Sequence, residues 1–255
     1  MRFASLGSGS EGNGLLAEWQ DTRVLLDCGF TLGETVRRLA RLGLEPADLS
    51  AILATHEHSD HLSGVAPLAR RYGIPVYGSF GTLALLRDEL DAALLQPVSD
   101  ARPFSVGALT VEPFSVPHDA REPLQYVLGN GSLRLGVLTD TGCATPHIEG
   151  MLRTCDALFL ETNYDPQMLA QGPYPPHLKA RVRGRFGHLS NGEAADLLSR
   201  LDHARLQWVV AAHVSRKNNT PELAQRALAA VLGWDPAAVA VADQHEGLDW
   251  HLLQS

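Results

Sequence analysis

The chain has 255 residues, of which 45% are hydrophobic, and its formal net charge at neutral pH is −8. This length and composition predict a single domain over residues 1–255, and the negative charge argues against nucleic-acid binding over the whole surface, although not in a local basic groove. Because neither a signal peptide nor a run of about 20 apolar residues is present, we expect a cytoplasmic protein that does not enter a membrane.

The first feature in chain order is a loop rich in glycine and serine, residues 7–12, which fits the G-x-G-x-x-G pattern of dinucleotide sites. Such a site needs a helix directly after the loop, because the helix N-terminus holds the pyrophosphate. Residues 15–19 and 23–27 instead predict two strands joined by a turn. We therefore interpret the loop as a flexible rim of a site, where Ser8 and Ser10 let a substrate approach the backbone.

The rest of the chain predicts strands that alternate with helices. We expect strands at residues 49–54, 75–77, 109–116, 126–128, 133–138, 157–160, 206–211, 238–242 and 248–252. We expect helices at residues 31–42, 62–72 and 81–92, from a capping box at Ser190 and Glu193 to Leu201, and after Thr220-Pro221. The three cysteines, at unrelated spacings, indicate neither a disulfide framework nor a CxxC zinc site, and their role stays open: Cys28, Cys143 and Cys155.

The strand at 49–54 ends at the sequence Thr-His-Glu-His-Ser-Asp-His, residues 55–61. Imidazoles and carboxylates are difficult to bury without partners, but they are the ligands that divalent first-row metals take. In an extended segment His56 and His58 project to the same side and can hold one ion. Asp60 and His61 follow where the chain turns into a helix and can reach a second ion. We interpret the motif as a metal site, against the alternative of a solvated histidine-rich turn.

Three further side chains of the metal-binding type come directly after apolar strands: His118, Asp140 and His213. Each of them alone would be interpreted as a structural or surface residue. Strand ends at one edge of a sheet gather loops around a site, however, so together with the motif they predict seven ligands. We assign His56, His58 and His118 to one ion, Asp60, His61 and His213 to the other, and Asp140 to a bridging position. An open position on each ion is typical of a catalytic site.

This arrangement resembles the metallo-β-lactamase-fold hydrolases, whose motif His-x-His-x-Asp-His is matched by residues 56–61. The resemblance covers nearly the whole chain and implies an α/β fold, a four-layer αββα sandwich with two zinc or manganese ions at one edge of its two sheets. Dizinc lactamases often have cysteine where Asp140 stands, so antibiotic hydrolysis is not expected. The chain is most similar to the YycJ or WalJ branch of 5′→3′ DNA exonucleases, through residues 5–10, 187–191 and 213–219.

Basic residues flank two of the predicted site segments: Lys179, Arg181, Arg183, Arg185, Arg216 and Lys217. A run of charges is usually a solvated helix face, but guanidinium groups also suit phosphate oxygens. We therefore expect Arg183, Arg185, Arg216 and Lys217 to bind a phosphate-bearing substrate. His188 resembles a histidine that lies beside the scissile phosphate in related tRNA-processing nucleases. It is either a catalytic acid or phosphate ligand, or a structural residue at the start of a helix.

These residues predict hydrolysis of a phosphodiester, most simply of DNA, by a hydroxide that bridges the two ions. Asp60 would orient this nucleophile and His188 would protonate the leaving oxygen. Three alternatives stay open: a phosphodiesterase for a small or cyclic nucleotide-like substrate, a thioesterase, and a metal-binding regulatory protein without activity. The sequence leaves open the native metal, the polarity of cleavage and the formation of a homo-oligomer.

Overall fold

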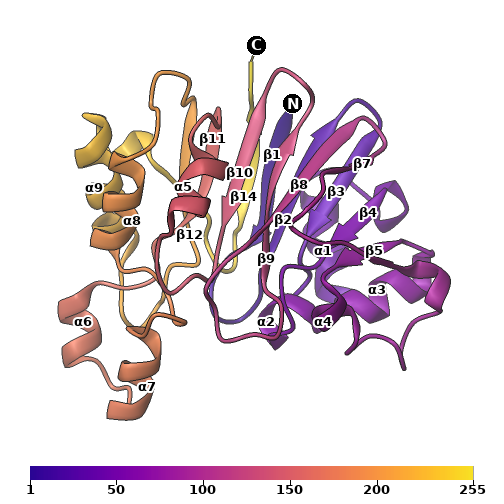
Figure 1. The fold of residues 1–255 in the computed structure, drawn as a ribbon, viewed down its shortest axis with the longest axis horizontal. Coiled ribbons are helices and arrows are strands. Elements are labelled where there is room, and N and C mark those ends of the chain that lie inside the picture. Colours follow the sequence, from indigo (N-terminus) through magenta and orange to yellow (C-terminus); the bar gives the residue numbers. More distant parts are fainter. Residues whose placement is uncertain (255) are drawn as a thin grey trace.

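Residues 1–254, which the computed structural model describes, form two β-sheets that pack face to face (Figure 1). The strands of the first sheet are β1 (Arg2–Gly7), β2 (Gly14–Trp19), β3 (Thr22–Leu26), β4 (Ala51–Leu53), β5 (Val76–Gly78), β6 (Leu95–Pro97) and β14 (Leu248–Leu252). Those of the second sheet are β7 (Phe104–Val106), β8 (Leu109–Ser115), β9 (Leu124–Gly129), β10 (Arg134–Leu138), β11 (Ala157–Glu161), β12 (Trp208–Ala212) and β13 (Ala240–Val241). The strand orders are β14-β1-β2-β3-β4-β5-β6 and β13-β12-β11-β10-β9-β8-β7.

Helices cover the outer face of each sheet, on the right and left sides of Figure 1. Beside the first sheet lie α1 (Leu32–Arg41), α2 (Ser59–Leu62), α3 (Val65–Tyr72) and α4 (Phe80–Leu83). Beside the second sheet lie α5 (Pro146–Leu152), α8 (Asn191–Ser199) and α9 (Pro221–Leu232), while α6 (Pro166–Gln171) and α7 (Pro176–Val182) project at its lower end. Short 3₁₀ helices occupy Pro46–Asp48, Ala92–Leu94 and Pro236–Ala238. The layer order helix–sheet–sheet–helix confirms the predicted four-layer α/β sandwich.

Alternating side chains of the strands fill two different cores. In β3, Val24 and Leu26 point into the core between the sheets, whereas Leu25 points into the core beneath the helices. Because both faces are buried, these strands appear in the sequence as continuous apolar runs. Tyr126 of β9 crosses between the sheets, and its buried hydroxyl donates a hydrogen bond of 2.9 Å to the backbone oxygen of Ala54. This bond ties the second sheet to the residue just before the histidine motif.

Two of the predicted helices differ from the structure. The helix predicted at 62–72 is divided between α2 and α3, because the backbone N–H of Gly64 donates to the oxygen of Cys28 at 2.7 Å and leaves no space for a Cβ there. The helix predicted at 81–92 is wrong beyond Leu83, where turns replace it. Leu86 and Leu90 are still buried, so successive turns satisfy the same apolar spacing that suggested a helix.

The other predicted elements agree with the structure. Strands β9 and β10 form the expected antiparallel hairpin, and β2 and β3 follow the glycine-rich loop with no helix after it. The reciprocal capping box of Ser190 and Glu193 opens α8, and Thr220 caps α9 before Pro221. Within residues 1–254, none of the helices combines the length and the apolar character that crossing a bilayer requires.

Candidate metal centre

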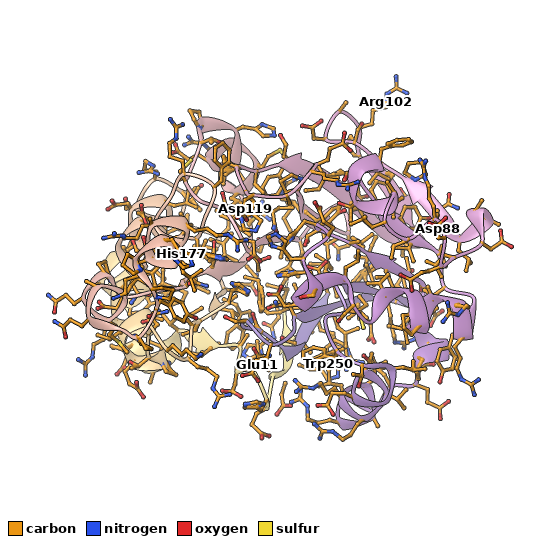
Figure 2. All side chains as sticks on the ribbon, turned by 90° about the horizontal axis from the view of Figure 1, so that it is seen from below. Glu11, Asp88, Arg102, Asp119, His177 and Trp250 are labelled. Carbon is orange, nitrogen blue, oxygen red and sulfur yellow. The ribbon has the colours of Figure 1, made fainter. Side chains whose placement is uncertain are left out.

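All seven side chains predicted to bind metal lie together at one edge of the two sheets. The histidine motif follows β4, His118 follows β8, Asp140 follows β10 and His213 follows β12. Strands β3 and β4 are parallel, as are β10, β11 and β12, so their carboxyl ends meet at this edge. Figure 2 views the molecule from this side, with Asp119, the neighbour of His118, near the centre.

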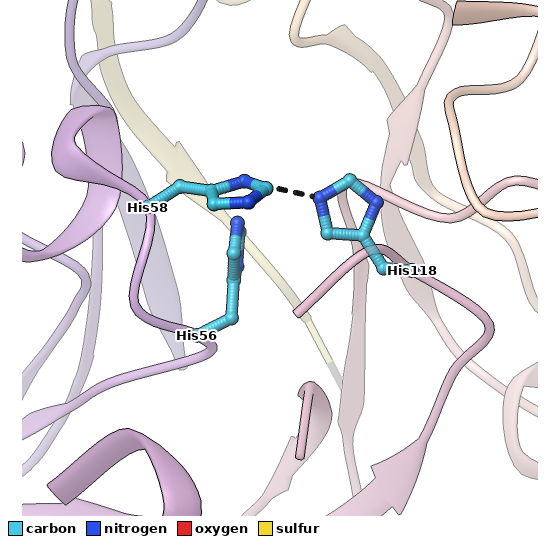
Figure 3. A group of neighbouring side chains, drawn as sticks. All are labelled: His56, His58 and His118. Carbon is cyan, nitrogen blue, oxygen red and sulfur yellow. Dashed lines mark hydrogen bonds between the residues drawn. The ribbon is translucent and has the colours of Figure 1, made fainter. Parts of the chain in front are cut away.

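The first group consists of His56, His58 and His118, one nitrogen of each lying within 4.8 Å of the others (Figure 3). The outer nitrogens of two of these rings face backbone oxygens. His118 Nδ1 lies 3.1 Å from the oxygen of Gly187, and His58 Nε2 lies 3.2 Å from that of Asp119. A carbonyl can only accept, so both outer nitrogens carry the proton. The inner nitrogens, His118 Nε2 and His58 Nδ1, are therefore left with lone pairs that face each other at 3.2 Å.

The third ring of this group, that of His56, also has its proton on the outer nitrogen. The Thr55 hydroxyl donates to Asp27 Oδ2 at 2.8 Å and must therefore accept from His56 Nδ1, which lies 2.9 Å away. His56 Nε2 then holds a lone pair as well, and it is buried without a hydrogen-bond partner. Three converging lone pairs repel one another unless a cation lies between them. This part of the site fits a divalent metal ion.

The second group consists of Asp60, His61 and His213, again within 4.8 Å of one another. His61 Nδ1 donates to Asp27 Oδ2 at 2.8 Å, which turns His61 Nε2 inward, 3.5 Å from Asp60 Oδ2. His213 Nε2 also lies 3.5 Å from Asp60 Oδ2 and is buried without a hydrogen-bond partner. Asp27, which follows β3, also accepts hydrogen bonds of 2.8 Å from the backbone N–H and the hydroxyl of Thr55. Its bonds to Thr55 and His61 show that it braces the loop.

Asp140 lies between the two groups. Its Oδ2 atom is 3.0 Å from His61 Nε2 and is buried without a hydrogen-bond partner, and the same carboxylate forms a third cluster with His56 and His61. The seven residues are thus arranged as the sequence predicts, with two groups of three and one carboxylate between them. Several buried nitrogen and oxygen atoms without hydrogen-bond partners lie this close together, an arrangement that fits two divalent ions.

Three residues at the site have a backbone conformation that is unusual outside glycine. Asp27, Asp140 and His213 have φ values of 58°, 52° and 52°. Each follows a central strand, and the left-handed turn swings its side chain from the strand direction into the site. The backbone N–H of His213 is held by the hydroxyl of Ser8 at 2.8 Å, which fixes this turn.

The structure adds a carboxylate that the sequence interpretation missed. Glu161 is fully buried at the end of β11, and its Oε1 atom lies 2.7 Å from His188 Nδ1. Glu161 Oε2 accepts from the backbone N–H of Thr141 at 2.9 Å and from that of Leu189 at 3.3 Å. Both oxygens are therefore committed within the protein, which favours a supporting role over metal ligation. Its place at a strand end, like those of the predicted ligands, is the signal that could have identified it.

In the absence of metal, the electrostatics of the second group and of Asp140 favour charged side chains. Burial would lower the pKa of His213, but the carboxylates of Asp140, Asp60 and Glu161 outweigh it and raise this pKa to about 10. Burial likewise opposes the charged form of His61, but Asp140 and Asp27 raise its pKa well above the usual value. The pKa values of Asp60 and Asp140 are lowered, because the neighbouring histidines outweigh the effect of burial.

Metal uptake by the metal-free protein is therefore expected to release protons. At about pH 7.5, His61 and His213 are protonated in the empty site, and each must lose a proton to bind a cation, so we expect release of about two protons and weaker binding as the pH falls. Calorimetric titration with zinc in buffers of different ionisation enthalpy measures this number. The same apparent enthalpy in every buffer would contradict the prediction.

A cavity of about 370 Å³ opens over the cluster. Its lining includes the candidate ligands Asp60, Asp140 and His213, together with His188, Asp119 and Arg181. Arg181 Nε donates to Asp119 Oδ2, and its two terminal nitrogens have no hydrogen-bond partner within residues 1–254. The sequence predicted substrate contacts at Arg183 and Arg185 instead; both are exposed but lie outside this lining.

The other predicted substrate contacts, at Ser8, Ser10, Arg216 and Lys217, also differ in whether they line the metal cavity. Ser8 is 2% exposed and bonds to Asn13 and His213, so its side chain supports the site from within. Ser10 lines both the metal cavity and a neighbouring hollow of about 220 Å³. Arg216 and Lys217 line that second hollow, where Arg216 lies 3.3 Å from Glu11.

Comparisons with known proteins agree with this geometry. The family model described as "Beta-lactamase superfamily domain" matches residues 22–210. The exodeoxyribonuclease YycJ of Bacillus anthracis is 34% identical over 237 residues, which cover 91% of this chain and 89% of the relative. The exodeoxyribonuclease WalJ of Streptococcus pneumoniae is 33% identical over 228 residues, covering 88% and 85% of the two chains.

Among solved structures, the metallo-β-lactamase fold protein YhfI from Bacillus subtilis superposes with a TM-score of 0.76 over 98% of both chains, at 17% identity, and so shows the fold alone. The family match over residues 22–210 and the identity to both exodeoxyribonucleases show the family as well as the fold. This chain belongs to the beta-lactamase superfamily, in the branch of the metallo-β-lactamase fold that contains YycJ and WalJ.

Proposed function

We propose that the protein is a metal-dependent phosphodiester hydrolase that acts as a 5′→3′ DNA exonuclease. The observation that carries this proposal is the lining of the metal cavity, which combines four of the seven clustered ligands with Arg181, whose terminal guanidinium nitrogens have no hydrogen-bond partner within residues 1–254. Such an arrangement suits a phosphate oxygen held between cations. The names of the YycJ and WalJ relatives support DNA as the substrate and an end as the place of attack.

The ligands divide between two zinc or manganese ions. His56, His58 and His118 would hold one, Asp60, His61 and His213 the other, and Asp140 would contact both. When bound, the ions supply Lewis acidity toward the phosphate oxygens and lower the pKa of the attacking water. Asp60 faces the cavity with a carboxylate that the amide of Asn13 steadies at 3.4 Å, so it is placed to orient this water.

His188 is proposed as the group that protonates the leaving oxygen. Its Nδ1 proton is held by the buried carboxylate of Glu161, and its Nε2 atom has no hydrogen-bond partner within residues 1–254. The side chain lines the cavity and is 22% exposed, so the free edge of the ring faces the substrate. Burial alone would lower the pKa of His188, but Glu161 and Asp140 raise it, which favours the charged ring, the form that can donate a proton.

A second hollow, next to the metal cavity, is proposed to bind the rest of the nucleic-acid strand. Ser10 lies between the metal cavity and the hollow lined by Arg216 and Lys217. A nucleic-acid strand whose scissile phosphate lies over the ligands would bring a neighbouring phosphate toward these cations. Net acidity of the whole chain confines attraction of a polyanion to such local sites.

The cavity volume of about 370 Å³ also falls in the range of pockets for small molecules, which favours a small or cyclic phosphodiester as a second candidate. One experiment tests both. Purified protein loaded with manganese or zinc is given 5′-labelled single-stranded DNA, duplex DNA, RNA, a cyclic dinucleotide and bis-nitrophenyl phosphate. Shortening of DNA from the 5′ end supports the exonuclease; turnover of only the small substrates supports the second candidate. No hydrolysis with any metal would reject both.

Arg181 is expected to bind substrate phosphate without taking part in metal binding. Arg181→Ala should raise the KM for DNA about 10-fold, the effect of about one lost charged hydrogen bond, and should reduce the slope of log affinity against log salt by roughly 0.7 to 0.9. Arg37→Ala is the matched control, because Arg37 is similarly exposed (66% against 60%) and similarly paired with a carboxylate. Unchanged KM and salt dependence in Arg181→Ala would show that phosphate binds elsewhere.

A further inference from the structure

An exposed aromatic ring stands beside the candidate site. Phe186 is 61% exposed and lies in the short loop between the basic helix α7 and His188. Among the other phenylalanines of residues 1–254, only Phe80 is exposed to a similar extent, at 60%. The guanidinium of Arg87 covers the Phe80 ring, 4.4 Å from the ring centre. Exposure of the Phe186 ring to water forgoes the hydrophobic free energy that burial would provide, and it leaves the face of the ring available to a ligand.

The loop that carries Phe186 is firmly attached to the metal centre. The backbone oxygen of Phe186 accepts from the N–H of Asp119 at 3.0 Å, and the oxygen of Gly187 faces His118 Nδ1 at 3.1 Å. On the other side, Gly142 lies so close to the backbone of Arg185 and Phe186 that a Cβ there would approach to 2.2 Å. The loop thus rests on the segments that follow two predicted ligands, His118 and Asp140. The backbone that carries the ring is therefore held in place two residues from His188.

Two arginines without partners among the described residues lie close to this ring in the chain. Arg183 and Arg185 are exposed and have no ion pair or side-chain hydrogen bond within residues 1–254. Most other arginines of this acidic protein are paired, for example Arg37 with Glu34 and Arg200 with Glu149. Two free guanidinium groups next to an exposed aromatic ring form the combination that binds single-stranded nucleic acid, in which cations track the phosphates and the ring stacks on a base.

We propose that Phe186, Arg183 and Arg185 form a platform for single-stranded nucleic acid, on which Phe186 stacks with an unpaired base close to the cleaved phosphate. The distance from Phe186 to His188 along the chain, at most about 7.6 Å, corresponds to about one or two nucleotides. A paired base inside a duplex already stacks on its neighbours and cannot offer its face to Phe186. The platform therefore favours single strands and frayed or overhanging ends over blunt duplex. This inference rests on the proposed function for its substrate class.

Equilibrium binding tests the platform independently of catalysis. The metal-loaded protein is titrated with a fluorescein-labelled, phosphorothioate-linked oligothymidine that resists cleavage, and anisotropy is recorded. Phe186→Ala should weaken binding roughly 5-fold to 100-fold, the loss of one stacked base, and Phe186→Trp should restore it. Arg183→Ala with Arg185→Ala should weaken binding and flatten its salt dependence. Phe80→Ala is the matched control and should bind like the unaltered protein. Metal content and melting temperature should be unchanged in Phe186→Ala, because the side chain is exposed.

The outcomes separate this inference from the proposed function. If the oligonucleotide binds and Phe186→Ala weakens binding while Phe80→Ala does not, the platform stands, even if the protein cleaves no nucleic acid and the exonuclease proposal fails. If the unaltered protein does not bind the oligonucleotide, or Phe186→Ala binds equally well, the platform is rejected, and an active nuclease would then hold its strand elsewhere. An equal weakening in Phe80→Ala would also reject it, because the effect would then come from general surface hydrophobicity.

Discussion

Asp60→Ala is expected to remove detectable hydrolysis of every substrate. The carboxylate lies 3.5 Å from both His61 Nε2 and His213 Nε2, and it is the only acidic member of that group of three. Without it, the second ion would keep only two histidines and the shared carboxylate of Asp140, and it would lose the negative charge that Asp60 supplies. We therefore expect the metal content to fall from about two equivalents to about one, with activity at the background rate. Elemental analysis after gel filtration, together with turnover of DNA and of bis-nitrophenyl phosphate, measures both effects.

The control for this variant is Asp249→Ala, because Asp249 is 83% exposed and pairs only with Arg41. It should retain both metal equivalents and full activity. Asp60→Asn should lie between the two, since an amide keeps the shape of the side chain but loses its charge. Two firmly bound equivalents in Asp60→Ala, or turnover within 10-fold of the unaltered protein, would show that the second ion does not depend on this carboxylate.

His188→Ala is expected to slow hydrolysis of DNA by about 10²- to 10⁴-fold while leaving the metals bound, which is the range of a lost general acid. The loss should be much smaller with bis-nitrophenyl phosphate, because nitrophenolate leaves without a proton. Glu161→Gln should show the same pattern in weaker form, since Glu161 orients His188 through the 2.7 Å contact with Nδ1. Single-turnover rates on the two substrates provide the comparison.

The exposed histidine His147 supplies the control, and His147→Ala should behave like the unaltered protein on both substrates. Equal losses on DNA and bis-nitrophenyl phosphate in His188→Ala would indicate that His188 binds phosphate rather than donating a proton. Loss of metal from the same variant would place His188 among the ligands, in the cluster it forms with Asp140, Glu161 and His213.

Local patterns predicted the alternating strands and helices and the placement of the seven side chains, and the resemblance to the metallo-β-lactamase-fold hydrolases supplied the four-layer arrangement. Apolar runs marked the buried strands, and polar residues directly after them marked one edge of the sheets. Glu161 also ends a strand, but a single glutamate has no neighbouring motif, and its contact with His188 joins residues 27 positions apart. No pattern within one segment reports such a contact.

The basic segment 179–185 shows a second reason why the sequence alone did not predict every site residue. The sequence grouped Lys179, Arg181, Arg183 and Arg185 by charge, but it did not predict α7. In the structure Arg181 lies within this helix and faces Asp119, whereas Arg183 and Arg185 follow its last turn and do not line the cavity. Which arginine reaches the site depends on where the helix ends. The direction of Ser8 depends similarly on a hydrogen bond to His213, 205 positions away.

The left-handed residues Asp27, Asp140 and His213 also bear on how this fold can change over evolution or in the laboratory. Glycine adopts their φ values without the steric cost of about 1 kcal/mol that a side chain adds, but glycine carries no ligand. Selection for stability and selection for activity therefore favour different residues at the same three strand ends. A descendant that no longer needs its metals could gain stability by acquiring glycine at these positions. In a divergent sequence of this fold, glycine there would mark a protein that has kept the scaffold and given up the chemistry.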